Sequence, residues 1–332
     1  MLTRLSTQSS SKSRCPDPCM TSDARIHVSL AHLRSLQGAA RGLSFLPRQP
    51  SASVLNGRHA SRLRGRGLNF EEMRDYLPGD DIRSIDWKAT ARTGTPHVRV
   101  FTEERDRPAL LVIDQRMSMF FGSQLNMKSV TAAEAAAIAA FRILDAGDRV
   151  GGIVFDNDAQ VEFAPKRSRQ TTYALLESIA EMNAGLHADR SATPAPGELN
   201  NVLRSVARIA HHDHLVFIFS DFDGIDETTQ RHLSGIARHN DVVLFLVYDP
   251  LSERIEPGDR AVIGDGLMQA EIDLGSESIR DAVSGFTRQR LEKIHRWQTE
   301  INLSVLPLSS GEETLPQIRR LMGGLSPRRR VR

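Results

Sequence analysis

The feature that most constrains the fold is an apolar run that ends directly in an aspartate. Residues 109–113 (Ala-Leu-Leu-Val-Ile) carry no polar side chain, and Asp114 follows them. A run of this length that is apolar on both faces is typical of a strand in the middle of a parallel sheet. The loop beyond it carries Arg116 and Ser118, and the carboxyl ends of strands line the crevice of open α/β sheets. We therefore expect the loop after Asp114 to form the functional site of the protein.

Runs of strand length alternate with helical patterns along the rest of the chain. Strands are expected at 109–113, 149–155, 160–163, 214–220, 242–248 and 301–306, with a small hairpin at 260–263 and 267–273. Helices are expected at 26–40, 128–146, 170–183, 197–210, 226–239, 278–300 and 313–322. This alternation predicts an α/β fold with a doubly wound, mostly parallel sheet. The strand at 214–220 also ends at an aspartate, Asp221.

Composition divides the chain into four parts. Residues 1–24 are rich in Ser, Pro and basic side chains and have little to bury, which predicts a disordered leader. An N-terminal region at 25–107 and an α/β domain at 108–323 follow, and a basic tail occupies 324–332. This division is compatible with a start codon at Met1 and also with one at Met20.

Cysteine usage and charge bear on the cellular setting. Cys15 and Cys19 both fall in the leader, so no disulfide is expected in the core, and neither a signal peptide nor a membrane-spanning apolar run is apparent. These observations predict a cytoplasmic protein. Residues 1–70 hold 11 Lys or Arg and 2 Asp, so a basic arm precedes a mildly acidic body. The arm, including Arg58–Arg66, is compatible with nucleic-acid binding or with packing against the body, and we favour the second.

A dense charged motif lies between the arm and the first buried strand. Residues 74–92 have the sequence RDYLPGDDIRSIDWKATAR, and the segment Val98–Arg105 follows before the strand that ends at Asp114. Within it, the alternation at 97–102 predicts a further strand. Over about residues 26–306 the chain resembles the DUF58 family. The resemblance implies a von Willebrand factor A-type fold with an N-terminal extension, and association with MoxR-type AAA+ ATPases and other von Willebrand factor A-type proteins. The motif residues are Arg74, Tyr76, Gly79, Asp80, Asp81, Arg83, Asp86, Trp87, Lys88 and Arg92.

The same resemblance implies a metal-ion-dependent adhesion site. Such a site uses an Asp-x-Ser-x-Ser loop, a Thr from a second loop and an Asp after a later strand, whose oxygens suit Mg²⁺. Asp114, Ser118 and Asp221 match three of these positions, and the Thr position falls nearest Thr171 or Thr172. The resemblance therefore implies a weak Mg²⁺ site formed by Asp114, Ser118 and Asp221.

Arg116 departs from this template, because it stands where the first Ser is expected. A guanidinium is permanently charged and has no lone pair to give to a metal. If Arg116 points into the crevice, it takes the place of the cation and pairs with Asp114 and Asp221. If it points outward, Asp114, Ser118 and Asp221 can still hold Mg²⁺ through water. We favour the first arrangement, in which the site holds no metal.

The acidic residues of the motif have two interpretations. Asp80, Asp81 and Asp86 together are compatible with a metal-dependent phosphoester hydrolase. In the interpretation that we favour, Asp80 caps a helical turn at 81–85 and the other two pair with nearby Arg and Lys side chains. Trp87 is then expected to cover this network and exclude water from it.

The sequence favours an interaction module over an enzyme. It contains neither a P-loop nor a Gly-x-Ser-x-Gly nucleophile elbow. We predict a non-enzymatic adaptor or co-chaperone of a MoxR-type AAA+ ATPase, with the ATPase implied by the resemblance. Its docking face is expected at residues 114–123, 156–158, 166–172 and 221–226. The alternatives are the hydrolase and a nucleic-acid-binding protein that uses the basic arm.

Overall fold

The computed structural model describes most of the α/β domain and part of the N-terminal region. The described residues are 24–41, 68–77, 80, 82–103, 107–187, 197–252, 260–264, 269–273, 277–301 and 303–323. Most of the predicted leader, the basic segment at 58–66 and the tail at 324–332 lie outside this set, as do Gly79 and Asp81 of the motif.

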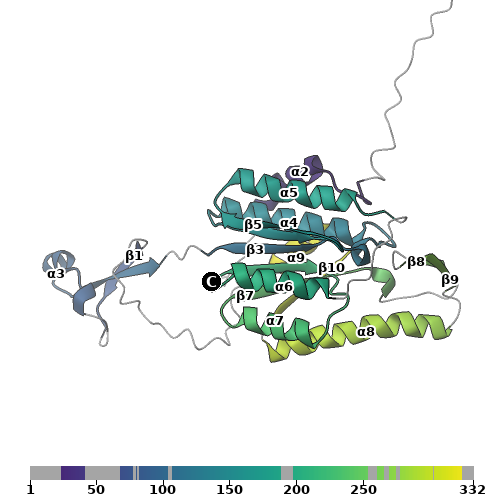
Figure 1. Cartoon of the computed structure of the whole chain (residues 1–332). Coiled ribbons are helices and arrows are strands. Elements are labelled where there is room, and N and C mark those ends of the chain that lie inside the picture. Colours follow the sequence, from purple (N-terminus) through teal and green to yellow (C-terminus); the bar gives the residue numbers. More distant parts are fainter. Residues whose placement is uncertain are drawn as a thin grey trace, which may run out of the picture.

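A six-stranded sheet forms the centre of the α/β domain (Figure 1). Its strand order is β10-β7-β6-β3-β4-β5, which places β3 in the interior. Every neighbouring pair is parallel except β4 with β5, which is antiparallel. The strands are β3 (Ala109–Asp114), β4 (Val150–Phe155), β5 (Gln160–Lys166), β6 (Leu215–Ser220), β7 (Asp241–Tyr248) and β10 (Ser304–Ser309).

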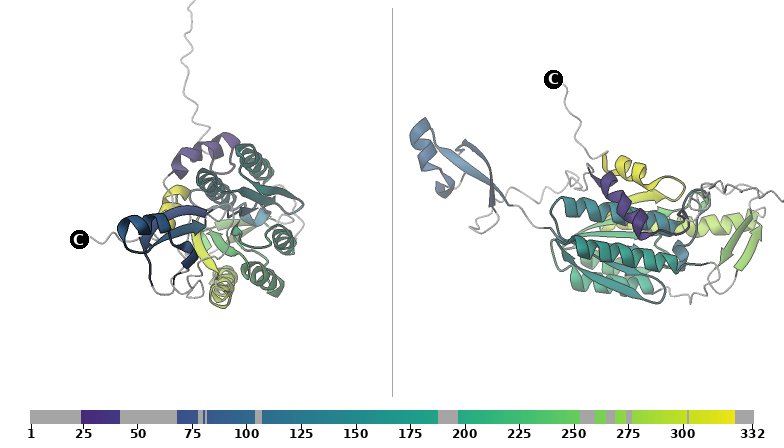
Figure 2. Two further views of the ribbon diagram at one scale, coloured as in Figure 1. Left: turned by 90° about the vertical axis from the view of Figure 1, so that its left-hand side faces the viewer. Right: turned by 90° about the horizontal axis from the view of Figure 1, so that it is seen from above.

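Helices cover both faces of the sheet, which confirms the predicted doubly wound α/β fold (Figure 2). One face is covered by α2 (Leu30–Ala40), α4 (Lys128–Asp145), α5 (Arg169–Ala184) and α9 (Thr314–Gly323). The other is covered by α6 (Glu198–Ile209), α7 (Glu227–Ala237) and α8 (Glu277–Glu300). Within the described residues, no helix combines the length and the apolar content needed to cross a membrane.

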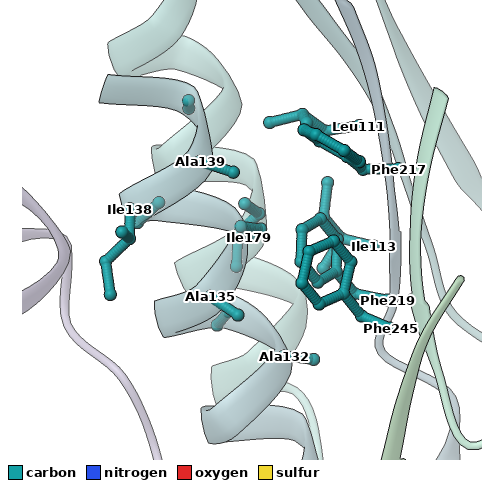
Figure 3. Close-up of a cluster of buried hydrophobic side chains, with 14 of the residues drawn as sticks. Leu111, Ile113, Ala132, Ala135, Ile138, Ala139, Ile179, Phe217, Phe219 and Phe245 are labelled. Carbon is teal, nitrogen blue, oxygen red and sulfur yellow. The ribbon is translucent and has the colours of Figure 1, made fainter. Parts of the chain in front are cut away.

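The core under α4 combines small helical side chains with large aromatic rings from the strands (Figure 3). Ala135 and Ala139 are among the many alanines of α4 that are fully buried there. Phe219 of β6 and Phe245 of β7 stack with ring centroids 4.5 Å apart, and Phe217 meets Phe245 edge-on. Because alanine occupies little volume, the helix can approach the sheet closely and the rings fill the remaining space.

The opposite face is packed from the alternate positions of the same strands. Leu110 and Val112 of β3 and Val216 of β6 are buried there against the helices of the second layer, with Trp297 of α8. Successive side chains of a strand point to opposite faces. Burial on both sides is therefore the reason why these strands are apolar without interruption.

The N-terminal region contributes a hairpin that Figure 1 shows outside the layers of the α/β domain. β1 (Leu68–Asp75) pairs antiparallel with β2 (His97–Glu103). The short helices η1 (Ile82–Ser84) and α3 (Trp87–Thr93) lie between these two strands in the sequence. We call the described residues of 68–103 the hairpin unit. A second hairpin, β8 (Arg260–Gly264) with β9 (Gln269–Asp273), precedes α8.

The observed elements agree with the expected ones apart from a few shifts and additions. β10 begins at Ser304, three residues later than expected. α2 begins at Leu30 because the side chain of Ser29 accepts a hydrogen bond from the backbone N–H of His32 and caps the helix there. β1 and α3 are additions, and α3 is short because Asp86 caps its start while Gly94, with φ of 80°, ends it.

Candidate functional site

The strand order brings the two predicted aspartates to one end of the sheet. β3 and β6 are adjacent and parallel, with Ile113 opposite Phe219, so Asp114 and Asp221 leave the sheet at the same end. We call this end the carboxyl edge. The hydroxyl of Ser118 donates to Oδ1 of Asp221 at 3.3 Å. Asp114, Ser118 and Asp221 are thus brought together in the way that the sequence predicts.

Arg116 points into the carboxyl edge and binds Asp114. Its Nε lies 3.0 and 3.1 Å from the two carboxylate oxygens of Asp114, and its Nη2 donates to Oδ2 of Asp114 at 2.7 Å. Its Nη1 donates to the backbone carbonyl of Asp223 at 3.2 Å. Asp114 is fully buried and Arg116 is only 4% exposed. The predicted contact between Asp114 and Arg116 is therefore present, as a bidentate ion pair inside the protein.

Asp221 is surrounded by cations from three elements. Lys128, the first residue of α4, places its Nζ 2.7 Å from Oδ2 of Asp221. Arg290 of α8 lies 4.0 Å from the same oxygen, and Nη2 of Arg116 lies 3.9 Å from Oδ1. Arg290 also pairs with the carboxylate of Asp223. The site therefore matches the carboxylates of Asp114, Asp221 and Asp223 with one lysine and two arginines.

The ionisation of the site follows from this matching of charges. Burial by itself would lower the pKa of Arg116, but the negative charge of Asp114 and its hydrogen bonds outweigh that effect and raise it. Burial would likewise raise the pKa of Asp221, yet the charges of Lys128, Arg290 and Arg116 hold it well below its usual range. Both groups are therefore firmly charged near neutral pH.

The residues as placed do not fit a Mg²⁺ ion. Both oxygens of Asp114 already accept hydrogen bonds from Arg116, and Oδ2 also accepts one from Ser220 at 2.6 Å. Both oxygens of Asp221 are likewise engaged, by Ser118 and Lys128. Among the described residues, no cluster of His, Cys, Asp and Glu that could hold a metal ion is found. Mg²⁺ requires near-octahedral oxygen ligation, and positive side chains at these carboxylates oppose it.

Thr171 and Thr172 do not belong to this edge. β5 runs antiparallel to β4, with Gln160 opposite Phe155 at the carboxyl edge and Lys166 opposite Val150 at the other end. Residues 166–172 are therefore delivered to the end of the sheet remote from Asp114. The buried hydroxyl of Thr172 donates to the carbonyl of Ser168 within the first turn of α5. The expectation that this segment joins the docking face is wrong.

The two other expected loops do reach the carboxyl edge. Asn157, in the turn at 156–158, accepts a hydrogen bond from the backbone N–H of Met117 at 2.7 Å. In the loop at 221–226, the backbone N–H of Asp223 donates to Oδ1 of Asp221. Phe222 has a positive φ of 55°, and its N–H is held by the hydroxyl of Ser220 at 2.8 Å. These contacts fix the loops around the ion pairs.

Several members of the site escape sequence reasoning. Lys128 and Arg290 belong to helices, and no local pattern singles them out from the other cations of the chain. Gln115 and Asn183 form a second, uncharged support: the amide of Asn183, near the end of α5, donates to Oε1 of Gln115 at 2.9 Å. The end of α5, and not its beginning, therefore meets the loop after Asp114. Ser220 and Asp223 are the exceptions, because the order Ser-Asp-x-Asp at 220–223 places both beside the predicted site residue Asp221.

In the charged motif of the hairpin unit, Asp80 and Trp87 are placed differently from the expectation. Asp80 forms a bidentate ion pair with Arg74, with both distances 2.8 Å, and does not cap the following helical turn. Asp86 accepts hydrogen bonds from the backbone N–H groups of Lys88 and Ala89, and so caps α3. Trp87 is 66% exposed and does not cover the network. The backbone needs of a turn and a helix end, which the carboxylates satisfy locally, explain this arrangement.

The fold and the site together define a class of protein. A six-stranded, mostly parallel sheet with helices on both faces is consistent with a Rossmann-like or von Willebrand factor A-like fold, and its charged site lies at the carboxyl ends of the strands. The chain belongs to the DUF58 family of proteins of unknown function, whose sequence profile matches residues 72–292. Uncharacterized proteins of Mycobacterium tuberculosis and Mycobacterium bovis are 30% identical over 254 residues, which cover 76% of this chain and 73% of each relative.

Proposed function

We propose that the chain is a non-enzymatic interaction module that binds a partner protein at the carboxyl edge without a metal. The observation that carries this proposal is the position of Arg116, which lies between Asp114 and Asp221 where a metal-dependent adhesion site would hold its cation. A protonated guanidinium supplies the positive charge permanently. The site is then ready for a partner without waiting for an ion.

The ionisation of the site opposes a role in proton transfer. A general base is most effective when its pKa lies near the working pH. The pKa of Asp221 lies far below that range because of the charges of Lys128, Arg290 and Arg116. Asp114 is in addition fully buried beneath Arg116. These carboxylates hold cations in place, which is a binding role.

The part of the site that a partner can reach is its outer rim. The side chain of Asp223 is 48% exposed and that of Arg290 is 26% exposed, whereas Asp114 is covered. The loop at 122–127, which leads into Lys128, lines an open hollow together with Arg25 and Ile26. A carboxylate of a partner can take the place of Asp223 in the ion pair with Arg290. The electrostatic cost is small because one ion pair replaces another.

The partner that we propose is a MoxR-type AAA+ ATPase, for which the chain would act as adaptor or co-chaperone. Membership of the DUF58 family supports this choice, since resemblance to that family implies such an association. Other von Willebrand factor A-type proteins are the second class of partner to test. The cytoplasm is the proposed compartment, because it contains ATP and the ATPase.

Binding to a purified MoxR-type AAA+ ATPase tests the proposal. Charge reversal at the rim, Arg290→Glu, is expected to weaken binding at least tenfold, and Asp221→Ala is expected to abolish it. Arg208→Glu is the matched control, because Arg208 is an exposed arginine near the end of α6 that pairs with Glu162 instead. Deletion of residues 1–23 should leave binding unchanged. Equal affinity of Arg290→Glu and wild type would remove the carboxyl edge from the proposal.

The two alternative functions receive less support. In the hydrolase interpretation, Asp80 and Asp86 would both have to bind metal, but Asp80 is held by Arg74 and Asp86 caps α3, while Asp81 lies outside the described residues. Hydrolysis of model phosphoesters that is abolished by Asp86→Ala would revive it. The basic segment at 58–66 also lies outside the described residues, and DNA binding that falls steeply with salt would support the nucleic-acid alternative.

A further inference from the structure

The hairpin unit carries the most exposed apolar side chains of the described residues. Leu77, Ile82 and Trp87 are 59%, 62% and 66% exposed, more than any other large apolar side chain in the part of the chain that the structure describes. We call these three residues, Leu77, Ile82 and Trp87, the Trp87 stretch. Single exposed apolar residues are ordinary, but three in one short stretch, one of them tryptophan, indicate a surface that another molecule covers.

Few of the apolar side chains of the hairpin unit whose exposure is described are buried. β1 and β2 form a two-stranded sheet without a third strand, and isolated two-stranded hairpins are marginally stable in water. Val98 is its one large apolar side chain described as buried, and Met73, on the opposite face of β1 from Arg74, is again exposed. Leu77, Ile82 and Trp87 stay mostly exposed in the folded chain, so a partner can cover them.

Backbone hydrogen bonds hold the described residues on either side of Ile82. The backbone N–H of Asp80 donates to the carbonyl of Leu77, and that of Asp86 donates to the carbonyl of His97. The ion pair between Arg74 and Asp80 closes the turn from the side. A surface whose backbone is already ordered loses less conformational entropy when it binds, so it is suited to recognition.

Charge identifies the kind of partner. Lys88 and Arg92, one turn apart on α3, are both exposed beside Trp87. Of the nearby carboxylates that the structure describes, Asp80 binds Arg74, Asp86 caps α3, and Asp75 lies 3.1 Å from His97. The apolar stretch is therefore bordered by positive charge on the side of α3. An apolar groove whose border carries carboxylates is complementary to it in both respects.

We propose that the Trp87 stretch is a second docking surface for the ATPase partner, and that it inserts into an apolar groove bordered by Asp or Glu. This inference rests on the proposed function, which supplies the partner, but it concerns a different surface from the carboxyl edge. A second copy of this chain is disfavoured because its lysine and arginine would meet their own equivalents. An anionic lipid surface is the alternative that the vesicle measurement below tests, because Lys88 and Arg92 would also be attracted to it.

Affinity measurements on the full chain test this inference with the purified MoxR-type AAA+ ATPase as the probe. Trp87→Ser is expected to weaken binding about tenfold or more, as for an aromatic residue at the centre of an interface. The double reversal Lys88→Glu with Arg92→Glu is expected to weaken it by a similar factor, and the loss should shrink at high salt. Val161→Ser is the matched control, because Val161 is an exposed apolar residue of β5, and its affinity should stay within about twofold of wild type.

The outcomes separate this inference from the proposed function. If wild type binds the ATPase and Trp87→Ser binds equally well, the second surface is disproved and the carboxyl edge is unaffected. If wild type does not bind the ATPase, the proposed function fails and this inference fails with it. If Trp87→Ser abolishes sedimentation with phosphatidylglycerol vesicles while leaving the ATPase affinity unchanged, the stretch is a lipid-binding surface and the inference is overturned.

Discussion

Two bidentate arginine–carboxylate pairs among the described residues lie in very different surroundings. Arg116 and Asp114 meet at the carboxyl edge, where their side chains are 5% and 0% exposed. Arg74 and Asp80 meet in the hairpin unit, where the corresponding fractions are 37% and 20%. Water screens the second pair and is excluded from the first. We therefore expect the buried pair of Arg116 and Asp114 to matter for the stability of the fold, and the exposed pair of Arg74 and Asp80 to stabilise only its own turn.

The difference arises from what each pair is attached to. Asp114 ends the interior strand of a six-stranded sheet, with helices on both faces. Asp80 lies in a turn beside a two-stranded hairpin. The carboxyl edge is thus rigid and internally satisfied, and the hairpin unit presents exposed apolar side chains. Under the proposed function, the two regions would supply different parts of one binding event, a fixed polar contact and an apolar anchor.

Removal of one member from each pair is expected to give the largest difference between the two regions. Asp114→Ala leaves the guanidinium of Arg116 buried without its partner, which is expected to lower the free energy of unfolding by about 3–5 kcal/mol. Asp80→Ala, the matched variant, is expected to cause a far smaller loss because water solvates Arg74. Urea unfolding of both variants measures the difference. Equal losses would contradict the contrast between the two pairs.

Replacement of the arginine that occupies the cation position should convert the site. Arg116→Ser gives the sequence Asp-x-Ser-x-Ser at 114–118 and frees both oxygens of Asp114. We expect the variant to be less stable than wild type without metal and to bind Mg²⁺. Each tenfold increase of Mg²⁺ above its dissociation constant should then raise the free energy of unfolding by about 1.4 kcal/mol. Calorimetric titration with Mg²⁺ checks this. Micromolar Mg²⁺ binding by wild type, absent in Asp221→Ala, would refute the metal-free site.

Acid should affect the carboxyl edge more than the hairpin unit. The pKa of Asp221 is lowered, so the folded state binds fewer protons than the unfolded state, and the resulting stability is present above the unfolded value of about 3.8. That stability is lost as the pH falls from there toward the lower folded-state pKa. Between about pH 5 and pH 2, we expect the free energy of unfolding of Asp221→Asn to fall less steeply with decreasing pH than that of wild type. Asp80→Asn should change this slope less. Identical slopes for the two variants would contradict the difference.

The smallest effect is expected from the exposed stretch itself. Trp87→Ser removes a side chain that is mostly solvated, so its free energy of unfolding should stay within about 0.5 kcal/mol of wild type. Thermal and urea unfolding of the purified chain measure this. A loss as large as that of Asp114→Ala would show that Trp87 supports the fold, and its effect on binding would then have to be reinterpreted.

Most of the fold could be predicted because its signals are local. The uninterrupted apolar run of β3 and the alanine-rich pattern of α4 specify a doubly buried strand and a closely packed helix from a few neighbouring residues. The site was predictable only in part: Asp114, Ser118 and Asp221 follow from strand ends and from resemblance to a family. Lys128 and Arg290 did not follow, since they are separated from Asp221 by 93 and 69 residues.

The sequence by itself determined most elements of the α/β domain, the two apolar faces of its sheet and the placement of acidic residues after its central strands. These features depend on the period of side chains along the chain. Only the tertiary structure decided where Arg116 points and that Thr171 and Thr172 lie at the far end of the sheet. The first depends on which carboxylates surround a buried guanidinium. The second depends on the antiparallel direction of β5. Charge pairing and strand direction are properties of distant segments in contact, and no local pattern encodes them.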